Sequence, residues 1–323
     1  SAAIREAVNM NSNPARPPLV LIVGPTASGK SALALALSRS LPVTIINADA
    51  SQVYRDLNIV SARPSPDDLR RAPHKLFGHV DGASAYSAAA WAADAKAAIE
   101  EAHASWRMPV VVGGTGLYVR TLLEGIAPVP DIETDVRASV RKLNVGEAHA
   151  ALAVEDPSAA ARLSPNDTSR IARALEVVRS TGKPLQEWQR MRSGGIRDLV
   201  RLTPVILLPP RDVLFARCDM RFDAMIASGG LDEVSALMAR NLDPSLPVMR
   251  AIGVREIATL MANPAAAEAC IAQAKTATRQ YAKRQYTWFR NQSPADCLRI
   301  ETQLEVNNID NLVIKLQHMA LTD

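Results

Sequence analysis

The first part of the chain alternates short apolar runs with longer stretches of helical composition. Three apolar runs, rich in branched side chains, stand at residues 19–23, 43–46 and 109–112. Continuous runs of this kind are typical of strands buried on both faces of a parallel sheet. Helices are expected between and after them, at about 32–40, 87–106 and 117–124. The repetition of strand, loop and helix predicts a parallel sheet covered by helices.

This pattern breaks at Pro128 and Pro130, and no strand is expected from there to about residue 197. Helices are predicted instead, at roughly 133–144, 147–153 and 167–180. Asn166 or Asp167 is a candidate N-cap of the last helix, and Gly182 ends it. A fourth apolar run at 205–208 resumes the strand pattern, and later helices are predicted at roughly 213–227, 231–240, 253–262 and 265–290.

A glycine-rich loop joins the first predicted strand to its helix and matches the phosphate-binding pattern G-x-x-x-x-G-K-[ST]. Its residues are Gly24, Pro25, Thr26, Ala27, Ser28, Gly29, Lys30 and Ser31. The glycines allow the backbone N–H groups to point at phosphate oxygens, and Lys30 adds a positive charge. The Ser31 hydroxyl is a candidate ligand of Mg²⁺. A ligand that presents phosphate is therefore predicted here.

Two polar residues follow the next predicted strands. Asp49 comes directly after the second strand, and Thr115 lies among three glycines after the third. Because ligands of parallel sheets bind beyond the carboxyl ends of the strands, both are expected to face the P-loop ligand. Asp49 is a candidate Mg²⁺ ligand or general base. No typical Walker-B acid and no N-K-x-D motif occurs, which favours a kinase or a transferase over a motor ATPase or a GTPase.

Composition narrows the function classes only a little. The chain has 323 residues, is 48% hydrophobic and carries a formal net charge of +4. The three cysteines are far apart, which argues against a zinc site or a disulfide framework and suits a reducing cytosol. No apolar run approaches the length of a membrane span, and the five scattered histidines indicate no metal site.

Basic residues recur at helical spacing near the C-terminal end, at Lys275, Arg279, Lys283 and Arg290. A solvated helix face is the ordinary interpretation of such spacing. Nucleic-acid binding is the alternative, since further cations stand at Arg250 and Arg255 and at Arg170 and Arg173. Charge alone leaves both interpretations open.

The motifs taken together resemble the bacterial tRNA dimethylallyltransferases, also called tRNA isopentenyltransferases. The matching segments occur in the family's order over nearly all of residues 19–290. They are GPTASGKS, NADASQVYRDLNI, SARPS, SAYSAAAW, VVGGTGLYVRTLLEGIAP, LSPNDTSRIARALEVVRSTGKPL, MRAIGVREI and ATRQYAKRQYTWFR. The resemblance implies an α/β fold, with a P-loop NTPase-like parallel sheet flanked by helices and an all-helical insertion domain. We place the catalytic core at 17–129 and 199–323, the insertion, expected to contact tRNA, at 130–198, and a flexible tail at 1–16.

The activity that the resemblance implies is transfer of a dimethylallyl group from its diphosphate to N6 of an adenine in tRNA. The adenine is the one immediately 3′ of the anticodon in tRNAs that read codons beginning with U, and the products are N6-isopentenyladenosine and diphosphate. The implied partners are the anticodon stem-loop of tRNA and dimethylallyl diphosphate, with Mg²⁺ as cofactor. A cytoplasmic monomer that contacts no membrane is expected.

The resemblance also implies roles for individual residues. Asp49 matches the acid that accepts the amino proton, Thr115 a threonine near the reaction centre that contacts the diphosphate, and Lys30 a catalytic cation. Gly24–Ser31 match the diphosphate cradle, to which we add Arg255, and Ser31 matches a residue that helps to hold Mg²⁺. The positions expected to contact tRNA are Asp49, Ala50, Ser51, Gln52, Thr115, Arg137, Ser169, Arg170, Ile171, Ala172, Arg173, Arg250, Ala251, Ile252, Gly253, Val254 and Arg255.

The chain departs from the family pattern at four positions. Ala50 stands where the family usually has Ser, Lys75 and Gly78 replace His and Asp, and Val254 replaces a frequent Tyr. Two other enzymes remain as alternatives, an adenylate isopentenyltransferase that uses free adenine nucleotides and a P-loop small-molecule kinase. A non-catalytic RNA-binding protein is a third alternative.

Overall fold

A computed structural model describes residues 16–293 and 296–322. The tail predicted at 1–16 therefore lies, apart from Arg16, outside the described residues. The chain forms two compact units. One contains the residues up to Leu122 and those from Arg197 onward, and the other is Leu123–Ile196. The second unit thus begins before the predicted start of the helical insertion at 130.

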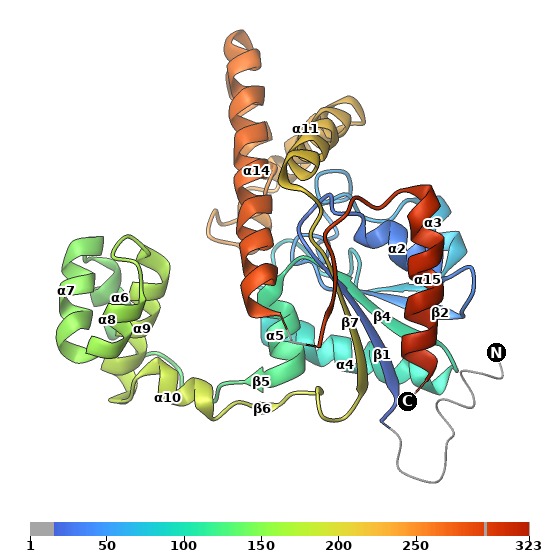
Figure 1. Ribbon diagram of the computed structural model, residues 1–323. Coiled ribbons are helices and arrows are strands. Elements are labelled where there is room, and N and C mark those ends of the chain that lie inside the picture. The colour runs from blue at the N-terminus through green and yellow to red at the C-terminus, as the bar shows by residue number, and fades with distance from the viewer. Residues whose placement is uncertain (1–15, 294–295, 323) are drawn as a thin grey trace. The chain divides into compact units, whose positions relative to one another are not determined.

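The first unit is built on a six-stranded sheet in which every neighbouring pair is parallel, with the strand order β3-β2-β4-β1-β7-β8 (Figure 1). Its strands are β1 (Pro18–Val23), β2 (Val43–Asn47), β3 (His74–Lys75), β4 (Met108–Gly113), β7 (Arg201–Leu207) and β8 (Leu298–Ile300). The sheet and its flanking helices confirm the predicted α/β class.

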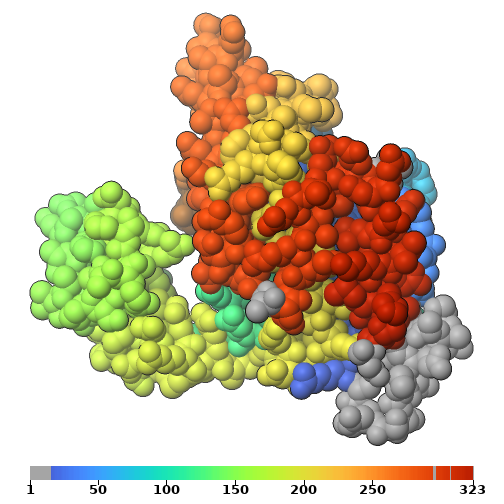
Figure 2. Space-filling view, viewed as in Figure 1, coloured from blue at the N-terminus to red at the C-terminus, as the bar shows by residue number. Residues whose placement is uncertain are grey.

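Helices cover both faces of this sheet. Alternate strand residues such as Val20 and Ile22 pack with α2 (Lys30–Leu37) and α15 (Val306–Leu321) in one apolar cluster. From the other side, α4 (Ala88–Ala104) packs against β2 and β4 (Figure 1). Figure 2 shows the C-terminal residues, in red, as a continuous cover over part of this unit. Both faces are therefore buried, as the unbroken apolar runs predicted.

The first unit contains six further helices and two 3₁₀ turns among its described residues. They are α3 (Pro66–Arg71), α5 (Gly116–Glu124), α11 (Arg211–Ala227), α12 (Gly230–Ala239), α13 (Val254–Ala262) and α14 (Ala267–Gln292), with the 3₁₀ turns η1 (Pro247–Arg250) and η2 (Pro264–Ala266). The long helix α14 packs against α11 (Figure 1) and also against α13.

The second unit has its own small core. Its elements are β5 (Gly125–Ile126), α6 (Thr134–Arg141), α7 (Val145–Glu155), α8 (Pro157–Arg162), α9 (Thr168–Thr181), α10 (Leu185–Arg190) and β6 (Ser193–Gly194). Val140, Leu152 and Leu175 are among the buried residues that join α6, α7 and α9. Asp167 is the N-cap of α9, because its carboxylate accepts the Arg170 N–H at 3.1 Å, and Gly182 ends the helix at φ 68°.

The expectation that no strand lies between residues 128 and 197 is wrong at one point. Ser193–Gly194 form the two-residue strand β6, which pairs antiparallel with β5. A two-residue strand that contains glycine is too short to show an apolar pattern in the sequence. The elements α3, α8, α10, β3, β8 and α15 were not predicted, and most of them are only two to six residues long.

Candidate active site

The P-loop is a turn between β1 and α2 that requires glycine at two positions, Gly24 and Gly29. A Cβ at Gly24 would lie 2.4 Å from the Leu207 carbonyl oxygen, so the loop runs against β7. Gly29 has φ +97° and Ala27 has φ 61°, both in the left-handed region. The helix α2 begins at Lys30, directly after the loop. Its first N–H groups have no partner within the helix and are free to bind an anion.

Lys30 folds back across this loop. Its Nζ donates to the Pro25 carbonyl oxygen at 2.6 Å and reaches the Ser28 hydroxyl at 3.5 Å. Burial lowers the pKa of Lys30 to about 8, although the nearby Asp49 carboxylate favours the charged form. The ammonium group therefore stands over the loop, where it would meet a phosphate.

Asp49 is held by the turn that follows β2. The buried Asn47 accepts the Asp49 N–H at 2.8 Å and donates to the carbonyl oxygens of Asp49 and Leu76. The backbone N–H and the hydroxyl of Ser51 both donate to Oδ1 of Asp49, at 2.9 and 2.7 Å. These contacts fix the orientation of the carboxylate and fall on one of its two oxygens, which leaves Oδ2 to act on a ligand.

Thr115 lies beside the Asp49 turn. Its hydroxyl accepts the Ala50 N–H at 2.9 Å, and its own N–H donates to the Ala48 carbonyl oxygen at 3.2 Å. A Cβ at the neighbouring Gly113 would lie 2.1 Å from the Ala48 backbone, so the two loops touch here. The structure thus brings together the two residues that the sequence placed at the ends of separate strands.

One cavity collects the charged side chains near the P-loop. It has a volume of about 190 Å³, and its charged lining residues are Lys30, Asp49, Arg63, Asp68 and Arg221. Thr26, Ala27, Gly29, Ser31 and Gln52 also line it, whereas Thr115 does not. With three cations and two carboxylates the cavity suits an anion next to a group that loses a proton.

Arg221 of α11 is a site residue that the sequence analysis missed. Its guanidinium donates to the Thr26 hydroxyl at 2.7 Å and to the Ser61 carbonyl oxygen at 3.1 Å, and burial lowers its pKa. It therefore joins the P-loop to the 61–64 wall of the cavity. Nothing in the local sequence marks Arg221, because it lies in the middle of a helix that packs here only in the tertiary structure.

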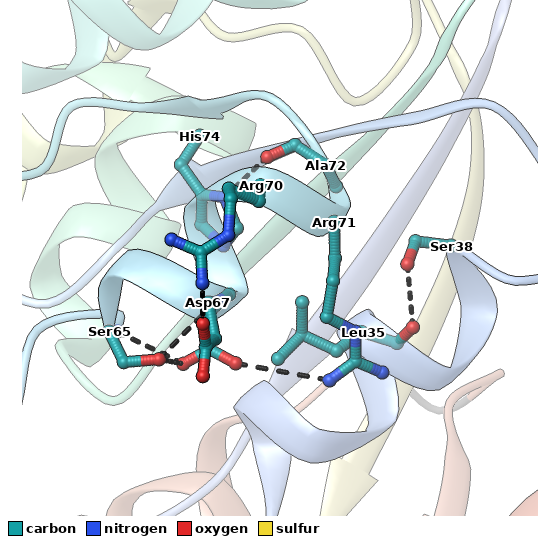
Figure 3. A network of polar contacts seen from close by, with 9 residues as sticks. Leu35, Ser38, Ser65, Asp67, Arg70, Arg71, Ala72 and His74 are labelled. Atoms are coloured by element: carbon teal, nitrogen blue, oxygen red, sulfur yellow. Dashed lines mark hydrogen bonds and ion pairs between the residues drawn. The ribbon is translucent and has the colours of Figure 1, made fainter.

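The helix α3, which also escaped prediction, contributes Asp68 to the lining of the cavity, and Figure 3 shows the polar contacts around this helix. Ser65 and Asp68 form a capping box at its start, and Arg71 lies 3.9 Å from Asp68. His74 follows, with its Nδ1 2.8 Å from the Ala72 carbonyl oxygen. The sequence Ser-Pro-Asp-Asp, with a capping residue, a proline and an acid in order, is a helix start signal that would have found α3.

The cations predicted to form one basic face of α14 are only partly available. Lys275 and Arg279 are ion-paired at 2.7 Å with Asp223 and Asp219 of α11. Their charges therefore serve helix packing, and the other two predicted positions are left for a solvated or nucleic-acid-binding face. Lys283 and Arg290 are exposed.

Several predicted RNA-contacting residues cannot use their side chains for that purpose. Ile171 is fully buried in the core of the second unit, and Val254 is buried in the first. By contrast, the predicted positions Arg137, Ser169, Arg170, Arg173, Arg250 and Arg255 are exposed. Arg255 does not line the cavity, so its grouping with the diphosphate cradle finds no support in this geometry.

Among the residues that the structure describes, no group of three or more His, Cys, Asp or Glu side chains is placed to hold a metal ion. Ser31 lies at the cavity with Asp49 and Asp68. This set fits a Mg²⁺ that takes most of its ligands from phosphate oxygens and water. The three cysteines are free thiols, as expected. No helix in the described ranges is long and apolar enough to cross a membrane.

These features define an α/β protein with a P-loop after β1 and a carboxylate after β2, two strands away in the same sheet. Comparison with known families then identifies it further. Residues 52–292 match the family described as IPP transferase, and residues 17–77 match isopentenyl transferase. The chain therefore belongs to the IPP transferase family.

Relatives and solved structures agree with this assignment. The chain is 59% identical to a tRNA dimethylallyltransferase of Sphingopyxis alaskensis over 94% of this chain and 100% of the relative. It is 56% identical to that of Erythrobacter litoralis, over 89% and 92% of the two chains. The tRNA isopentenylpyrophosphate transferase of Bacillus halodurans matches with a TM-score of 0.68 and 31% identity, over 94% and 96%. A eukaryotic dimethylallyltransferase acting on tRNA matches with a TM-score of 0.77 and 27% identity, over 92% and 77%. These neighbours confirm the P-loop NTPase-like fold.

Proposed function

We propose that this chain transfers a dimethylallyl group from dimethylallyl diphosphate to the N6 amine of an adenine in tRNA. The observation that carries the proposal is one cavity that holds the P-loop cation Lys30 and the carboxylate of Asp49. A diphosphate leaving group and a proton-losing nucleophile need these two groups side by side. The relatives named tRNA dimethylallyltransferase support this choice of transferred group and acceptor.

The reaction breaks the bond between C1 of the dimethylallyl group and the diphosphate oxygen and forms a bond between C1 and N6. Diphosphate leaves with the electron pair, and its growing charge is met by Lys30, Arg221 and the N–H groups at the start of α2. The adenine amine is a poor nucleophile, so its placement decides the rate. The N6 proton passes to Oδ2 of Asp49, whose Oδ1 is held by Ser51.

A bound Mg²⁺ would be held by the Ser31 hydroxyl and by the oxygens of the diphosphate. When bound it supplies positive charge that stabilises the leaving group. Asp68 faces the same cavity and is a further candidate ligand.

The RNA substrate must bring its adenine out of the stack to reach this cavity. We propose that the acceptor is the adenine immediately 3′ of the anticodon in tRNAs that read codons beginning with U. Exposed cations, among them Arg170 and Arg173 of α9 and Lys283 and Arg290 of α14, would contact tRNA phosphates. The family resemblance supports the acceptor position.

Incubation of the protein with dimethylallyl diphosphate, Mg²⁺ and unmodified tRNA tests the proposal by mass spectrometry of the tRNA nucleosides. N6-isopentenyladenosine at a single position is expected. AMP in place of tRNA is the matched control, and transfer to AMP alone would identify an adenylate isopentenyltransferase. Phosphate transfer from ATP without prenyl transfer would identify a kinase.

A further inference from the structure

The amide of Gln285 connects two loops of the active site. This side chain of α14 is buried, with 7% of its surface exposed. Its Oε1 accepts the N–H of Thr26 in the P-loop at 2.8 Å, and its Nε2 donates to the Gly114 carbonyl oxygen at 2.9 Å. The partners fix the orientation of the amide, since a flipped amide would set donor against donor and acceptor against acceptor.

Two glycines show that side chains of α14 lie directly on the loop around Thr115. A Cβ at Gly114 would lie 2.4 Å from Nε2 of Gln285, and one at Gly116 would lie 1.9 Å from Nε1 of Trp288. Gln285 and Trp288 are three residues apart and share one face of the helix. The two glycines on either side of Thr115 therefore make room for two consecutive contacts with α14.

Thr26 belongs to the P-loop, whose backbone N–H groups are the expected ligands of the phosphate. Its N–H is bound to Gln285, while its hydroxyl accepts from Arg221. The start of the phosphate cradle is thus tied to α14 and α11 and not to the anion. On the other side, Thr115 accepts the N–H of Ala50, next to Asp49. One amide therefore sets the spacing between the cradle and the turn that carries the base.

We propose that Gln285 is a positioning residue of the transfer reaction, one that holds the P-loop and the Thr115 loop at the spacing that the two substrates need. The inference rests on the proposed function, because the spacing matters only if donor and acceptor meet between these loops. Displacement of reacting groups by about 1 Å can cost on the order of 10²-fold in rate. Loss of the amide is expected to lower kcat more than it raises either KM.

Two substitutions test this role. Gln285→Met keeps the approximate volume but leaves the Thr26 N–H and the Gly114 carbonyl without their partner. We expect kcat to fall about 10- to 100-fold, with KM for tRNA within about threefold of the wild-type value. Thr287→Ala is the matched control, since its exposed hydroxyl donates to the Lys283 carbonyl oxygen of the same helix. It should leave kcat unchanged.

Gln285→Glu allows a measurement whose result would not change if the amide had only a structural role. In its acid form the new side chain accepts from Thr26 through C=O and donates O–H to Gly114, as the amide does. Its carboxylate form has no proton to donate and sets an oxygen against the Gly114 carbonyl. The ratio of Q285E kcat to wild-type kcat should therefore rise as the pH is lowered from 8 to 6. The same ratio for Q285M should stay flat.

The fraction of folded protein is measured for every variant by thermal unfolding, and inorganic diphosphate binding by calorimetry. A folded Q285M with kcat within twofold of wild type would overturn the inference, as would a pH-independent ratio for Q285E. Failure of the wild-type chain to prenylate tRNA would instead remove the proposed function. In that case the calorimetry still decides, because a cradle held by Gln285 predicts diphosphate binding at least about threefold weaker in Q285M, and equal binding contradicts it.

Discussion

The cavity at the strand ends and the surface of the helical unit differ in how their charged side chains are held. In the cavity, Lys30 is bonded within the P-loop, Asp49 is held by Ser51 of its own turn, and Arg221 bridges two separate loops. In the helical unit, Arg170 pairs only with Asp167 three residues away, and Arg137 and Arg173 are exposed. Preorganised charges act on a transition state, whereas exposed charges add binding and little else. Changes in the cavity should therefore alter kcat or donor binding, and changes on the helical unit should alter tRNA binding.

The largest effect is expected from Asp49→Asn. The amide keeps an oxygen for the Ser51 contacts but cannot take the N6 proton, so kcat should fall at least about 10²-fold. Single-turnover transfer to tRNA measures this, with tRNA binding measured separately and expected to be near normal. Asp198→Asn is the control, because Asp198 is an exposed acid that does not line the cavity. A wild-type rate in Asp49→Asn would remove Asp49 from the mechanism.

Arg221→Lys should come next. A lysine keeps the charge but cannot join the Thr26 hydroxyl and the Ser61 carbonyl with one planar fork. We expect KM for dimethylallyl diphosphate to rise about 10- to 30-fold, with KM for tRNA almost unchanged. Arg217→Lys, one helical turn earlier, is the matched control. An equal rise in both KM values would contradict the assignment of Arg221 to the donor site.

The pKa of Lys30 predicts a pH dependence of donor binding. The ordinary pKa of a lysine is 10.5, and burial lowers that of Lys30 to about 8. Below this value the ammonium is charged and meets the diphosphate; above it the proton is lost from the free enzyme. KM for the donor should rise up to about tenfold per pH unit above 8. Lys30→Arg, charged throughout, should be less active but show no such rise, and an identical pH profile would contradict the assignment.

The smallest effect is expected on the helical unit. Arg170→Ala with Arg173→Ala should raise KM for tRNA about three- to tenfold and leave kcat unchanged, because exposed phosphate contacts add binding only. The dependence of binding on salt should also become shallower. Arg179→Ala is the control, since Arg179 is paired with Glu155 at 2.8 Å. A fall in kcat would show that the helical unit takes part in the chemistry.

The parts of the fold that repeat a pattern were predictable from sequence. β1, β2 and β4 are mostly apolar, and their carboxyl ends bring the Asp49 turn and the Thr115 loop to the P-loop edge of the sheet, as parallel strands require. The P-loop itself is local chemistry, fixed by Gly24 and Gly29. These features depend on residues that are neighbours in sequence or on a rule that all parallel sheets obey.

The parts that depend on tertiary packing were not predictable. Arg221 and Gln285 reach the P-loop from helices about 200 residues or more away, at separations of 195 and 259 residues. The spacing of Lys275 and Arg279 suggested a binding face, but the acids that neutralise them lie on α11. Charge patterns on one helix cannot reveal a partner on another.

The short β5–β6 pair has a consequence for how such a chain can be remodelled. Gly125 lies opposite Gly194 and Ile126 opposite Ser193, so the helical unit leaves and re-enters at two points about 5 Å apart. Its termini are joined like the ends of a hairpin, and it has a core of its own. The helical unit is therefore an insertion that can be removed or replaced as a whole. A tight two-residue turn would span the gap left by its removal, and a different RNA-binding module would fit the same pair of ends.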